Sequence, residues 1–329
     1  MPTQPLLSIC IISYNTADLT LDAVRSSVID ILDTPSLTNH CQIIVVDNAS
    51  ADDSVKVLSA FKSTSKVPIT IIENTTNAGF AKANNQAIAE SHGTYVLLLN
   101  SDTFVQPGAL EKLVIAFRNN PEKSSADLSS YHNAIDRLGI AAATLVNPDG
   151  TYQPQGGSYP SLFSLSVHML MLNKIPFIGR FLPSTQKDID VTPQLDKEYP
   201  SLVKQDWVAG TAMMLRKDTF QEIGGLDEAI FMYAEDMELC VRAKDHHWDV
   251  AIVPGAYVTH LKTASSNPEK ALLGELKGYQ YIWAKHKASW QLGIATIIMK
   301  AGASLRVLLF GTMKQPEKVR TYTAALKEL

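Results

Sequence analysis

Hydrophobic positions in the first hundred residues fall into short β-branched runs that alternate with stretches of helical periodicity. Four runs predict strands, at Leu7–Ser13, Gln42–Asp47, Ile69–Glu73 and Tyr95–Asn100. Apolar residues at helical spacing predict helices that begin near Ala17, near Ser50 or Asp52, and at Gly79. This alternation is typical of βαβ units, so we expect an α/β fold with a parallel sheet.

Polar residues follow the C-terminal ends of three predicted strands. They are Tyr14-Asn15, Asp47-Asn48 and Asn100-Ser101-Asp102. Right-handed crossovers align the C-terminal ends of parallel strands along one edge of a sheet, where open α/β sheets bind ligands. We therefore expect these polar residues to form a ligand-binding edge.

The rest of the chain has weaker patterns. They predict a helix from Pro107 to Arg118, a surface excursion from Asn119 to Ser130, a strand from Trp207 to Leu215, a turn from Ile223 to Asp227, a helix from Glu235 to Lys244 and a last strand from Val250 to Val253. Residues Leu162 to Leu182 are apolar but interrupted by charges, proline and glycine, so we expect a helix plus a loop. Ordinary packing and contact with an acceptor or a membrane both stay open for this segment.

The segment from Phe231 to Cys240 places three acidic side chains among apolar ones. Burying an ionised carboxylate is costly unless a cation, a hydrogen-bond partner or a reaction needs it. Glu235 and Asp236 are therefore candidates for proton transfer, because a positioned carboxylate can act as a general base. The structural alternative is a helix start, where acidic residues are favoured by the helix dipole.

Five motifs, in order over residues 6 to 265, resemble the inverting GT-A glycosyltransferases of family 2, and within it the bacterial rhamnosyltransferase-like branch. They are Asp47-Asn48-Ala49-Ser50, Asn77 to Asn85, Asn100-Ser101-Asp102, Trp207 to Ala212 and Glu235-Asp236, with Gly224 to Glu228 and Val258-Thr259-His260 at the family's spacing. The resemblance implies a Rossmann-like, mostly parallel central sheet flanked by helices. It divides this domain into a nucleotide-sugar-binding half, 1–105, and an acceptor-binding and catalytic half, 106–266. Beyond Pro268 it fades, and helical spacing predicts a basic, helical C-terminal extension, 267–329.

The resemblance also implies roles for individual residues. Asp236 is the implied general base, and Glu235 orients the acceptor. Asp102 and His260 are the implied ligands of Mn²⁺ or Mg²⁺, whereas Asn100 replaces the first acid of the common Asp-x-Asp motif and adds no charge. The implied nucleotide-binding residues are Ser13, Tyr14, Asn15, Asp47, Asn77, Lys82, Asn100, Ser101 and Asp102, and the implied acceptor-binding residues are Trp207, Gly210 and Thr211.

At the level of function, the resemblance implies transfer of L-rhamnose from dTDP-rhamnose, with inversion, to a bacterial surface glycan or its lipid-linked precursor. Two alternatives stay open: a UDP-hexose-dependent glycosyltransferase of the same fold, and a non-catalytic nucleotide-sugar-binding scaffold subunit. The presence of both Asp102 and Asp236 argues against the scaffold. A nucleotidyltransferase would need a glycine-rich loop near the N-terminus, which Leu6 to Thr16 lacks.

Composition and charge narrow the range of partners. The 329 residues are 46% hydrophobic, enough for a substantial core, and the net charge of -4 gives no general case for nucleic-acid binding. The charge is unevenly distributed along the chain. The segment from Ala284 to Leu329 contains eight Lys/Arg and two Asp/Glu, a net charge of +6. The preceding residues contain 21 Lys/Arg and 31 Asp/Glu, a net charge of -10. A basic tail suggests an anionic surface as its partner.

The tail also has apolar residues at helical spacing from Trp290 to Leu309. Such a helix can dock on the protein's own body, on a partner subunit such as the second copy of a homodimer, or on an anionic bilayer as a peripheral contact through 288–314. The uncharged run from Ala288 to Met299 ends at Lys300 and is too short to span a bilayer.

Two further features bear on location. Cys10, Cys41 and Cys240 have neither paired spacing nor a metal-binding signature, so we expect buried, reduced thiols. The N-terminus lacks a basic region followed by an apolar core, so no signal peptide is expected. Together these features predict a cytoplasmic protein, attached to the inner face of the cell membrane if the tail binds lipid.

Overall fold

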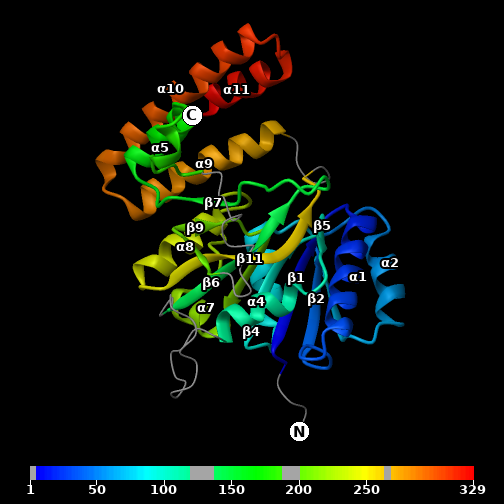
Figure 1. The fold of residues 1–329 in the computed structure, drawn as a ribbon. Coiled ribbons are helices and arrows are strands. Elements are labelled where there is room, and N and C mark those ends of the chain that lie inside the picture. Colours follow the sequence, from blue (N-terminus) through cyan, green and yellow to red (C-terminus); the bar gives the residue numbers. More distant parts are fainter. Residues whose placement is uncertain (1–4, 119–136, 187–200, 263–267) are drawn as a thin grey trace, which may run out of the picture.

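The centre of the molecule, described here from a computed structural model, is a nine-stranded mixed sheet (Figure 1). The structure describes residues 5–118, 137–186, 201–262 and 268–329. The strand order is β3-β2-β1-β4-β10-β6-β11-β5, β8 pairs with β11, and β7 and β9 form a separate two-stranded sheet. The strands are β1 (Leu7–Ser13), β2 (Cys41–Asp47), β3 (Ile69–Glu73), β4 (Tyr95–Asn100), β5 (Thr103–Val105), β6 (Leu138–Val146), β7 (Gly156–Gly157), β8 (Val203–Gln205), β9 (Trp207–Val208), β10 (Ala212–Arg216) and β11 (Asp249–His260).

Buried hydrophobic layers cover both faces of this sheet. Along β1, Leu7, Ile9 and Ile11 belong to one layer, while Cys10 and Ile12 belong to the other, because successive side chains of a strand point to opposite faces. The described helices are α1 (Ala17–Asp33), α2 (Ser54–Lys62), α3 (Phe80–Ala89), α4 (Ala109–Arg118), α5 (Leu162–Met169), α7 (Lys217–Ile223), α8 (Glu235–Asp245), α9 (Pro268–His286), α10 (Ser289–Thr312) and α11 (Pro316–Glu328), with short 3₁₀ turns η1 (Leu172–Lys174) and η2 (Gly179–Phe181). The expected α/β architecture with a mostly parallel central sheet is confirmed.

The predicted N-terminal strands are confirmed. β1, β3 and β4 have the predicted bounds, β2 begins one residue earlier, and the three neighbouring pairs are parallel. The register pairs Ser13 with Asp47, so the strand ends align along one edge. The second helix begins later than predicted, at Ser54, because the Asp52 carboxylate accepts hydrogen bonds from the backbone amides of Ala17 and Ser54 and stays in the loop.

Between Trp207 and Leu215 the prediction of one continuous strand is wrong. β9 pairs with β7, whereas β10 lies between β4 and β6 and is antiparallel to both. The interruption falls at Gly210, whose backbone amide donates a hydrogen bond to the Asp236 carboxylate, at 2.9 Å, rather than to a neighbouring strand. This interruption places a backbone donor beside the acidic pair.

The last strand is longer than its sequence pattern indicates. β11 extends from Asp249 to His260 rather than stopping at Val253. A register shift between Val253 and Tyr257, where Gly255 has a left-handed φ of 81°, disrupts the alternation that marks a strand. The additional residues carry His260 to the edge of the sheet where the polar residues lie.

The sequence pattern does not predict β6. All nine of its residues are buried, and it pairs with β10 and β11. A fully buried strand is a continuous apolar run, which periodicity alone does not distinguish from a buried helix. The predicted surface excursion from Asn119 to Ser130 lies outside the described residues.

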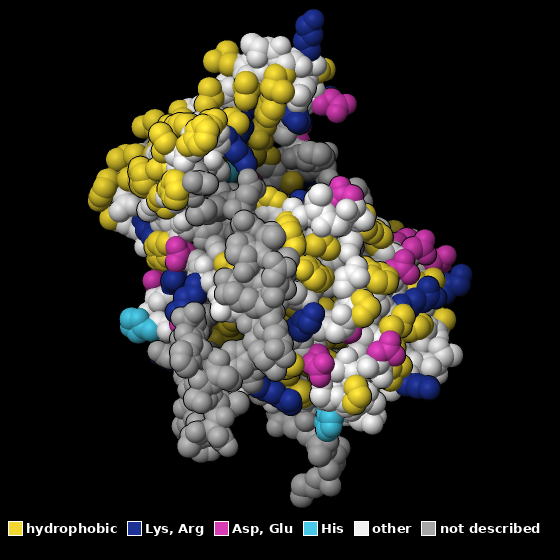
Figure 2. Space-filling model, viewed as in Figure 1, with side chains coloured by type: hydrophobic (Ala, Val, Ile, Leu, Met, Phe, Trp, Pro, Cys, Tyr) yellow, Lys and Arg dark blue, Asp and Glu magenta, His cyan; other side chains and the backbone are white. Residues whose placement is uncertain are grey.

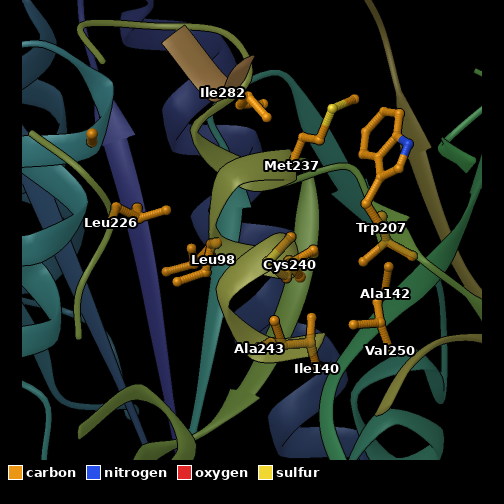
Figure 3. Close-up of a cluster of buried hydrophobic side chains, with 14 of the residues drawn as sticks. Leu98, Ile140, Ala142, Trp207, Leu226, Met237, Cys240, Ala243, Val250 and Ile282 are labelled. Carbon is orange, nitrogen blue, oxygen red and sulfur yellow. The ribbon is translucent and has the colours of Figure 1, made fainter. Parts of the chain in front are cut away.

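Helix α8 is fixed to the sheet by its buried side (Figure 3). Met237, Cys240 and Ala243 belong to the same buried cluster as Leu98 of β4 and Ala142 of β6. The three cysteines are buried and free, as predicted. This packing determines where α8 begins, and therefore where its acidic first turn lies.

The predicted C-terminal helical extension is present and consists of α9, α10 and α11, which lie with α5 at one end of the molecule (Figure 1). One side of α10 buries Ala295, Met299, Gly302 and Ala303, so the helix docks on the protein's own body. By length and composition alone, α10 is long and apolar enough to cross a membrane, and 22% of its apolar stretch is buried. The uncharged run that is too short to span a bilayer ends before Lys300, whereas α10 continues through that residue to Thr312.

Candidate active site

A cavity of about 520 Å³ opens at the C-terminal edge of the sheet, beside the start of α8. It collects most of the predicted site residues, although they come from distant parts of the chain. Those that line it are Tyr14, Asn77, Asn100, Ser101, Asp102, Trp207, Gly210, Thr211, Glu235, Asp236 and His260. The cavity is therefore the candidate active site.

Four predicted residues do not line the cavity: Ser13, Asn15, Asp47 and Lys82. The Ser13 hydroxyl is buried and lies 3.0 Å from the Thr20 hydroxyl. The Asn15 side-chain oxygen accepts a hydrogen bond from the backbone of the loop that follows β2. Lys82 is exposed on α3. In this structure the side chains of Ser13 and Asn15 therefore make hydrogen bonds within the protein, to the start of α1 and to the loop after β2.

Two buried oxygen atoms at the ends of β2 and β4 have no hydrogen-bond partner among the described residues, Asp47 Oδ1 and Asn100 Oδ1. The other carboxylate oxygen of Asp47 accepts a hydrogen bond from the Ser50 backbone amide at 2.9 Å. An unpaired buried acceptor costs about 1–3 kcal/mol. Asn100 lines the cavity, so a hydroxyl or N–H group of a bound ligand would satisfy its oxygen.

Asp102 and His260, the two implied metal ligands, lie in direct contact. The Nε2 of His260 lies 3.3 Å from Oδ1 of Asp102, and both side chains are largely buried. The antiparallel pairing of β5 with β11 aligns Thr103 with His260 and so positions the two residues side by side. The Leu261 backbone amide also donates to the Asp102 carbonyl oxygen, at 3.0 Å.

Gln153 determines how the imidazole is oriented. Its side-chain Nε2 donates to the His260 carbonyl oxygen at 2.7 Å and to Oδ1 of Asn147 at 2.8 Å. The remaining Oε1 lies 3.0 Å from Nδ1 of His260 and accepts a hydrogen bond from its N–H group. In the neutral imidazole Nε2 therefore presents a lone pair to the carboxylate of Asp102.

A lone pair beside a carboxylate repels it unless a cation or a proton lies between them. The pair therefore fits a divalent cation, for which imidazole nitrogen and carboxylate oxygen are both suitable ligands. The hydrogen bond from the second ring nitrogen of His260 to Gln153 is the usual support for a metal-bound histidine. Across the described ranges, no cluster of three or more His, Cys, Asp or Glu side chains surrounds a metal position, and the candidate position has two such side chains, Asp102 and His260.

Glu235 and Asp236 begin α8 after two consecutive left-handed residues, Tyr233 (φ 73°) and Ala234 (φ 72°). Such φ values are unfavourable for residues with a Cβ, and they concentrate at functional sites. The carboxylate of Asp236 accepts hydrogen bonds from the backbone amides of Gly210, at 2.9 Å, and Met237, at 2.7 Å. We call Tyr233 and Ala234 the corner before α8. The corner directs the acidic pair into the cavity.

The two acids differ in their surroundings. Burial, and then the neighbouring charge of Asp236, raise the pKa of Glu235 to about 8, and its Oε2 is buried without a partner among the described residues. Burial also raises the pKa of Asp236, but its two backbone N–H donors oppose the shift by favouring the charged form. Burial therefore favours the protonated form of both acids, and the two backbone donors make Asp236 the one whose surroundings better stabilise a carboxylate.

Helix α9 adds polar groups to the cavity that the sequence analysis does not identify. Glu275 and Tyr279 line it, and burial raises the pKa of Glu275 to about 7. The Gln186 side-chain amide donates to Oε1 of Glu275 at 2.5 Å, and the Tyr279 hydroxyl donates to Oγ1 of Thr185 at 3.2 Å. In the sequence, Glu275 stands out only as an acidic residue within the apolar face of a predicted helix. Nothing in the sequence indicates that this helix reaches the edge of the sheet.

The arrangement combines a proton acceptor, a position suited to a divalent cation and a cavity large enough for a nucleotide sugar. Two matches to family models agree with this chemistry. Residues 8–177 match the model of glycosyl transferase family 2, and residues 194–273 match that of glycosyltransferase like family 2.

Similar proteins include two rhamnosyltransferases. The N-acetylglucosaminyl-diphospho-decaprenol L-rhamnosyltransferase of Mycobacterium tuberculosis is 25% identical over 264 residues, covering 76% of each chain. Rhamnosyltransferase WbbL of Escherichia coli K12 is 30% identical over 95 residues, or 29% of this chain and 36% of that protein.

Solved structures support the fold. A mannosyltransferase from Pyrobaculum calidifontis, in complex with GDP-Man and Mn²⁺, aligns over 99% of this chain and 88% of its own, with a TM-score of 0.57 and 14% identity. GalNAc-T7, with UDP, GalNAc and Mn²⁺, aligns over 86% of this chain and 48% of its own, with a TM-score of 0.59 and 15% identity. From the matched residues, the fold and the cavity together, we conclude that this chain belongs to glycosyl transferase family 2 and is a GT-A glycosyltransferase of the rhamnosyltransferase-like kind.

Proposed function

We propose that this enzyme transfers L-rhamnose from dTDP-rhamnose, with inversion at the anomeric carbon, to a hydroxyl group of a bacterial glycan or of its lipid-linked precursor. The observation that carries the proposal is the carboxylate of Asp236, held by two backbone N–H donors beside Glu235 in a cavity that also contains the Asp102–His260 pair. The names of the two rhamnosyltransferases to which the chain is similar support rhamnose as the transferred sugar, and dTDP as its carrier is what the family resemblance implies.

In the proposed reaction, Asp236 accepts the proton of the acceptor hydroxyl as its oxygen attacks the anomeric carbon. The bond between that carbon and the diphosphate oxygen breaks, and the nucleoside diphosphate leaves with the bonding electrons. The backbone amides of Gly210 and Met237 keep the carboxylate oriented, and Glu235 stays protonated, so the cavity does not hold two adjacent anions.

Asp102 and His260 would hold the divalent ion, Mn²⁺ or Mg²⁺. When bound, such an ion neutralises the charge that develops on the departing diphosphate. Asn77, Asn100 and Ser101 line the same part of the cavity and are the proposed contacts of the nucleotide, with Tyr14. Residues 1–105 would then supply most of the donor contacts.

Trp207, Gly210 and Thr211 line the cavity beside Asp236 and are the proposed acceptor contacts in the half formed by 106–266. The Trp207 indole N–H donates to the Thr185 carbonyl oxygen at 2.6 Å, which fixes the ring at the cavity wall. We place the enzyme on the cytoplasmic side of the membrane, where nucleotide sugars are available to it.

The donor is testable before the acceptor is known. We expect isothermal calorimetry with Mn²⁺ to rank dTDP-rhamnose above UDP-hexoses and GDP-mannose, and slow metal-dependent hydrolysis to follow the same order. Preference for a UDP-hexose would replace the proposed donor, while binding of a donor without turnover by any acceptor preparation would favour the scaffold alternative. With an acceptor in hand, proton NMR of the product distinguishes inversion from retention.

A further inference from the structure

Exposed apolar side chains gather at the end of the molecule formed by α5 and α10, as Figure 2 shows. They lie around η2 and on α10, which are linked through α5: α10 and η1 pack against α5, and η2 packs against η1. We call them the apolar face, and its residues are Ile175, Phe177, Ile178 and Phe181 around η2, and Trp290, Ile294, Ile297, Leu305 and Leu308 on α10. Soluble monomers rarely expose apolar side chains in such a concentration, so this face is a candidate interaction surface.

On α10 the exposed residues form a continuous stripe. Trp290, Ile294 and Ile297 recur at intervals of four and three residues, and Leu305 and Leu308 continue the same side of the helix. The buried residues of α10 lie on the opposite side. The helix therefore has two apolar sides, and only one of them is covered by the protein.

Around η2 the backbone holds apolar side chains outward. Phe177 has a left-handed φ of 64° while its side chain is 87% exposed, an unfavourable arrangement for an aromatic residue. The turn is closed by hydrogen bonds from Ile178 N to the Pro176 carbonyl oxygen and from Gly179 N to the Ile175 carbonyl oxygen, both 2.8 Å. The outward position of Phe177 is thus built into the turn.

Two partners could cover the apolar face, a second copy of the chain or an anionic bilayer, and the charges beside the face favour the bilayer. Exposed Lys174 precedes the turn, exposed Lys300 flanks the stripe on α10, and exposed Lys314 follows α10. The segment from Ala284 onward has a net charge of +6. A second copy of the chain would bring the same positive charges face to face, whereas an anionic bilayer offers an apolar interior and opposite charge together.

We infer that the apolar face docks on the surface of an anionic bilayer, with the exposed side of α10 and the η2 turn entering the interface between headgroups and acyl chains. Helix α9 packs against α10 and also supplies Glu275 to the cavity, so docking would bring the cavity close to a membrane-bound acceptor. That last step rests on the proposed function, whereas bilayer binding itself does not.

Co-sedimentation of the full-length protein with vesicles tests the inference. We expect binding to vesicles that contain phosphatidylglycerol and much weaker binding to phosphatidylcholine alone. The double variant Phe177→Ser, Phe181→Ser should reduce partitioning at least about a hundredfold, because burial of each aromatic side chain contributes about tenfold or more. Lys300→Gln should cost roughly fivefold at low salt and little at high salt.

The control is Ile29→Ser on α1, which removes an apolar residue that is 55% exposed far from this face and should leave vesicle binding unchanged. Three results would overturn the inference: full-length protein that does not sediment with anionic vesicles at low salt, serine variants that bind as the wild type does, or a wild-type dimer that the serine variants convert to monomers. Transfer to a soluble acceptor should survive the serine substitutions, so failure of vesicle binding and failure of the proposed reaction are measured separately.

Discussion

At the scale of single residues, the two acids at the start of α8 differ in the atoms that surround them. Glu235 is buried, and Asp236 receives two backbone N–H groups. Asp236→Asn keeps the size and the hydrogen-bonding capacity of the side chain but removes the proton acceptor. We expect transfer to fall by about 10²- to 10⁴-fold, with donor affinity nearly unchanged.

Steady-state transfer and calorimetry on the same preparation check this expectation. Glu222→Gln, a change of one exposed acid on α7, is the control and should retain full activity. An Asp236→Asn enzyme with most of the wild-type turnover would show that another group accepts the proton.

Metal binding is the second expectation at this scale. Asp102→Ala removes the carboxylate that faces Nε2 of His260 at 3.3 Å. We expect nucleotide binding in Mn²⁺ to weaken to the level measured with EDTA, because the remaining imidazole alone binds the ion poorly. Gln153→Ala should have a smaller effect, roughly 10- to 100-fold on metal affinity, since it only orients the ring. Equal nucleotide affinity in wild type and Asp102→Ala would remove Asp102 from the metal site.

The raised pKa of Glu275 leads to a prediction about how the stability of the protein depends on pH. Its pKa is raised to about 7 in the folded protein from the ordinary value of 4.5, so between these pH values the folded state binds more protons than the unfolded state. Stability contributed by this group is therefore present at low pH and is lost as the pH rises toward 7. Glu275→Gln cannot ionise, and we expect its melting temperature to depend less on pH between 5 and 7 than that of the wild type.

Thermal unfolding at a series of pH values measures the difference. Glu317→Gln, at an exposed position on α11, should show the pH dependence of the wild type. Parallel curves for Glu275→Gln and wild type would mean that Glu275 is ionised at the same pH in both states.

At the scale of elements, α9 supports the corner that precedes α8. Gly278 faces Ala234, and a Cβ at that position would lie 2.3 Å from the Ala234 Cβ, far closer than van der Waals contact. A Cβ at Gly274 would likewise lie 2.4 Å from Cδ2 of the Tyr233 ring. Two glycines one helical turn apart thus let α9 approach the left-handed corner that aims Asp236 into the cavity.

Gly278→Ala should therefore displace α9 or the corner. We expect a destabilisation of about 1–3 kcal/mol, as for other overpacked sites, together with lower turnover. Differential scanning calorimetry and transfer rates measure the two effects. Gly293→Ala is the matched control, because no atom lies within 4 Å of the added Cβ and alanine favours the helix. Equal stability of Gly278→Ala and wild type would indicate that α9 yields without strain.

At the scale of the whole molecule, the C-terminal extension is part of the core as well as of the surface. Tyr279, Ile282 and Trp283 of α9 are fully buried in the same cluster as Ala295 and Met299 of α10. Removal of 288–329 would expose this cluster to water. We expect the truncated protein to melt at a lower temperature and to aggregate, a loss that thermal unfolding with light scattering detects.

Phe177→Ser provides the contrast, because it removes exposed apolar surface without uncovering the core and should leave the melting temperature unchanged. A truncated protein as stable as the full chain would mean that α10 and α11 are dispensable for folding. Since truncation changes core and surface together, the serine substitutions are the cleaner test of bilayer docking.

The local sequence determined most of the first half of the fold. The alternation of apolar residues is repeated in each βα unit, so β1, β3 and β4 were predicted with their observed bounds. The polar residues at the strand ends could be predicted to meet, because parallel strands have a common edge. The motifs Asn100-Ser101-Asp102 and Glu235-Asp236 also pointed to the cavity without a structure.

Only the tertiary structure decided the features that depend on contacts distant in sequence. The pairing of β5 with β11 positions His260 beside Asp102, and the strand that carries it was predicted too short because the shift near Gly255 breaks its pattern. Glu275 reaches the cavity because glycines let α9 approach the corner before α8. Periodicity records which side of an element is apolar, but not what covers that side: one apolar side of α10 is buried against α5, and the other is exposed.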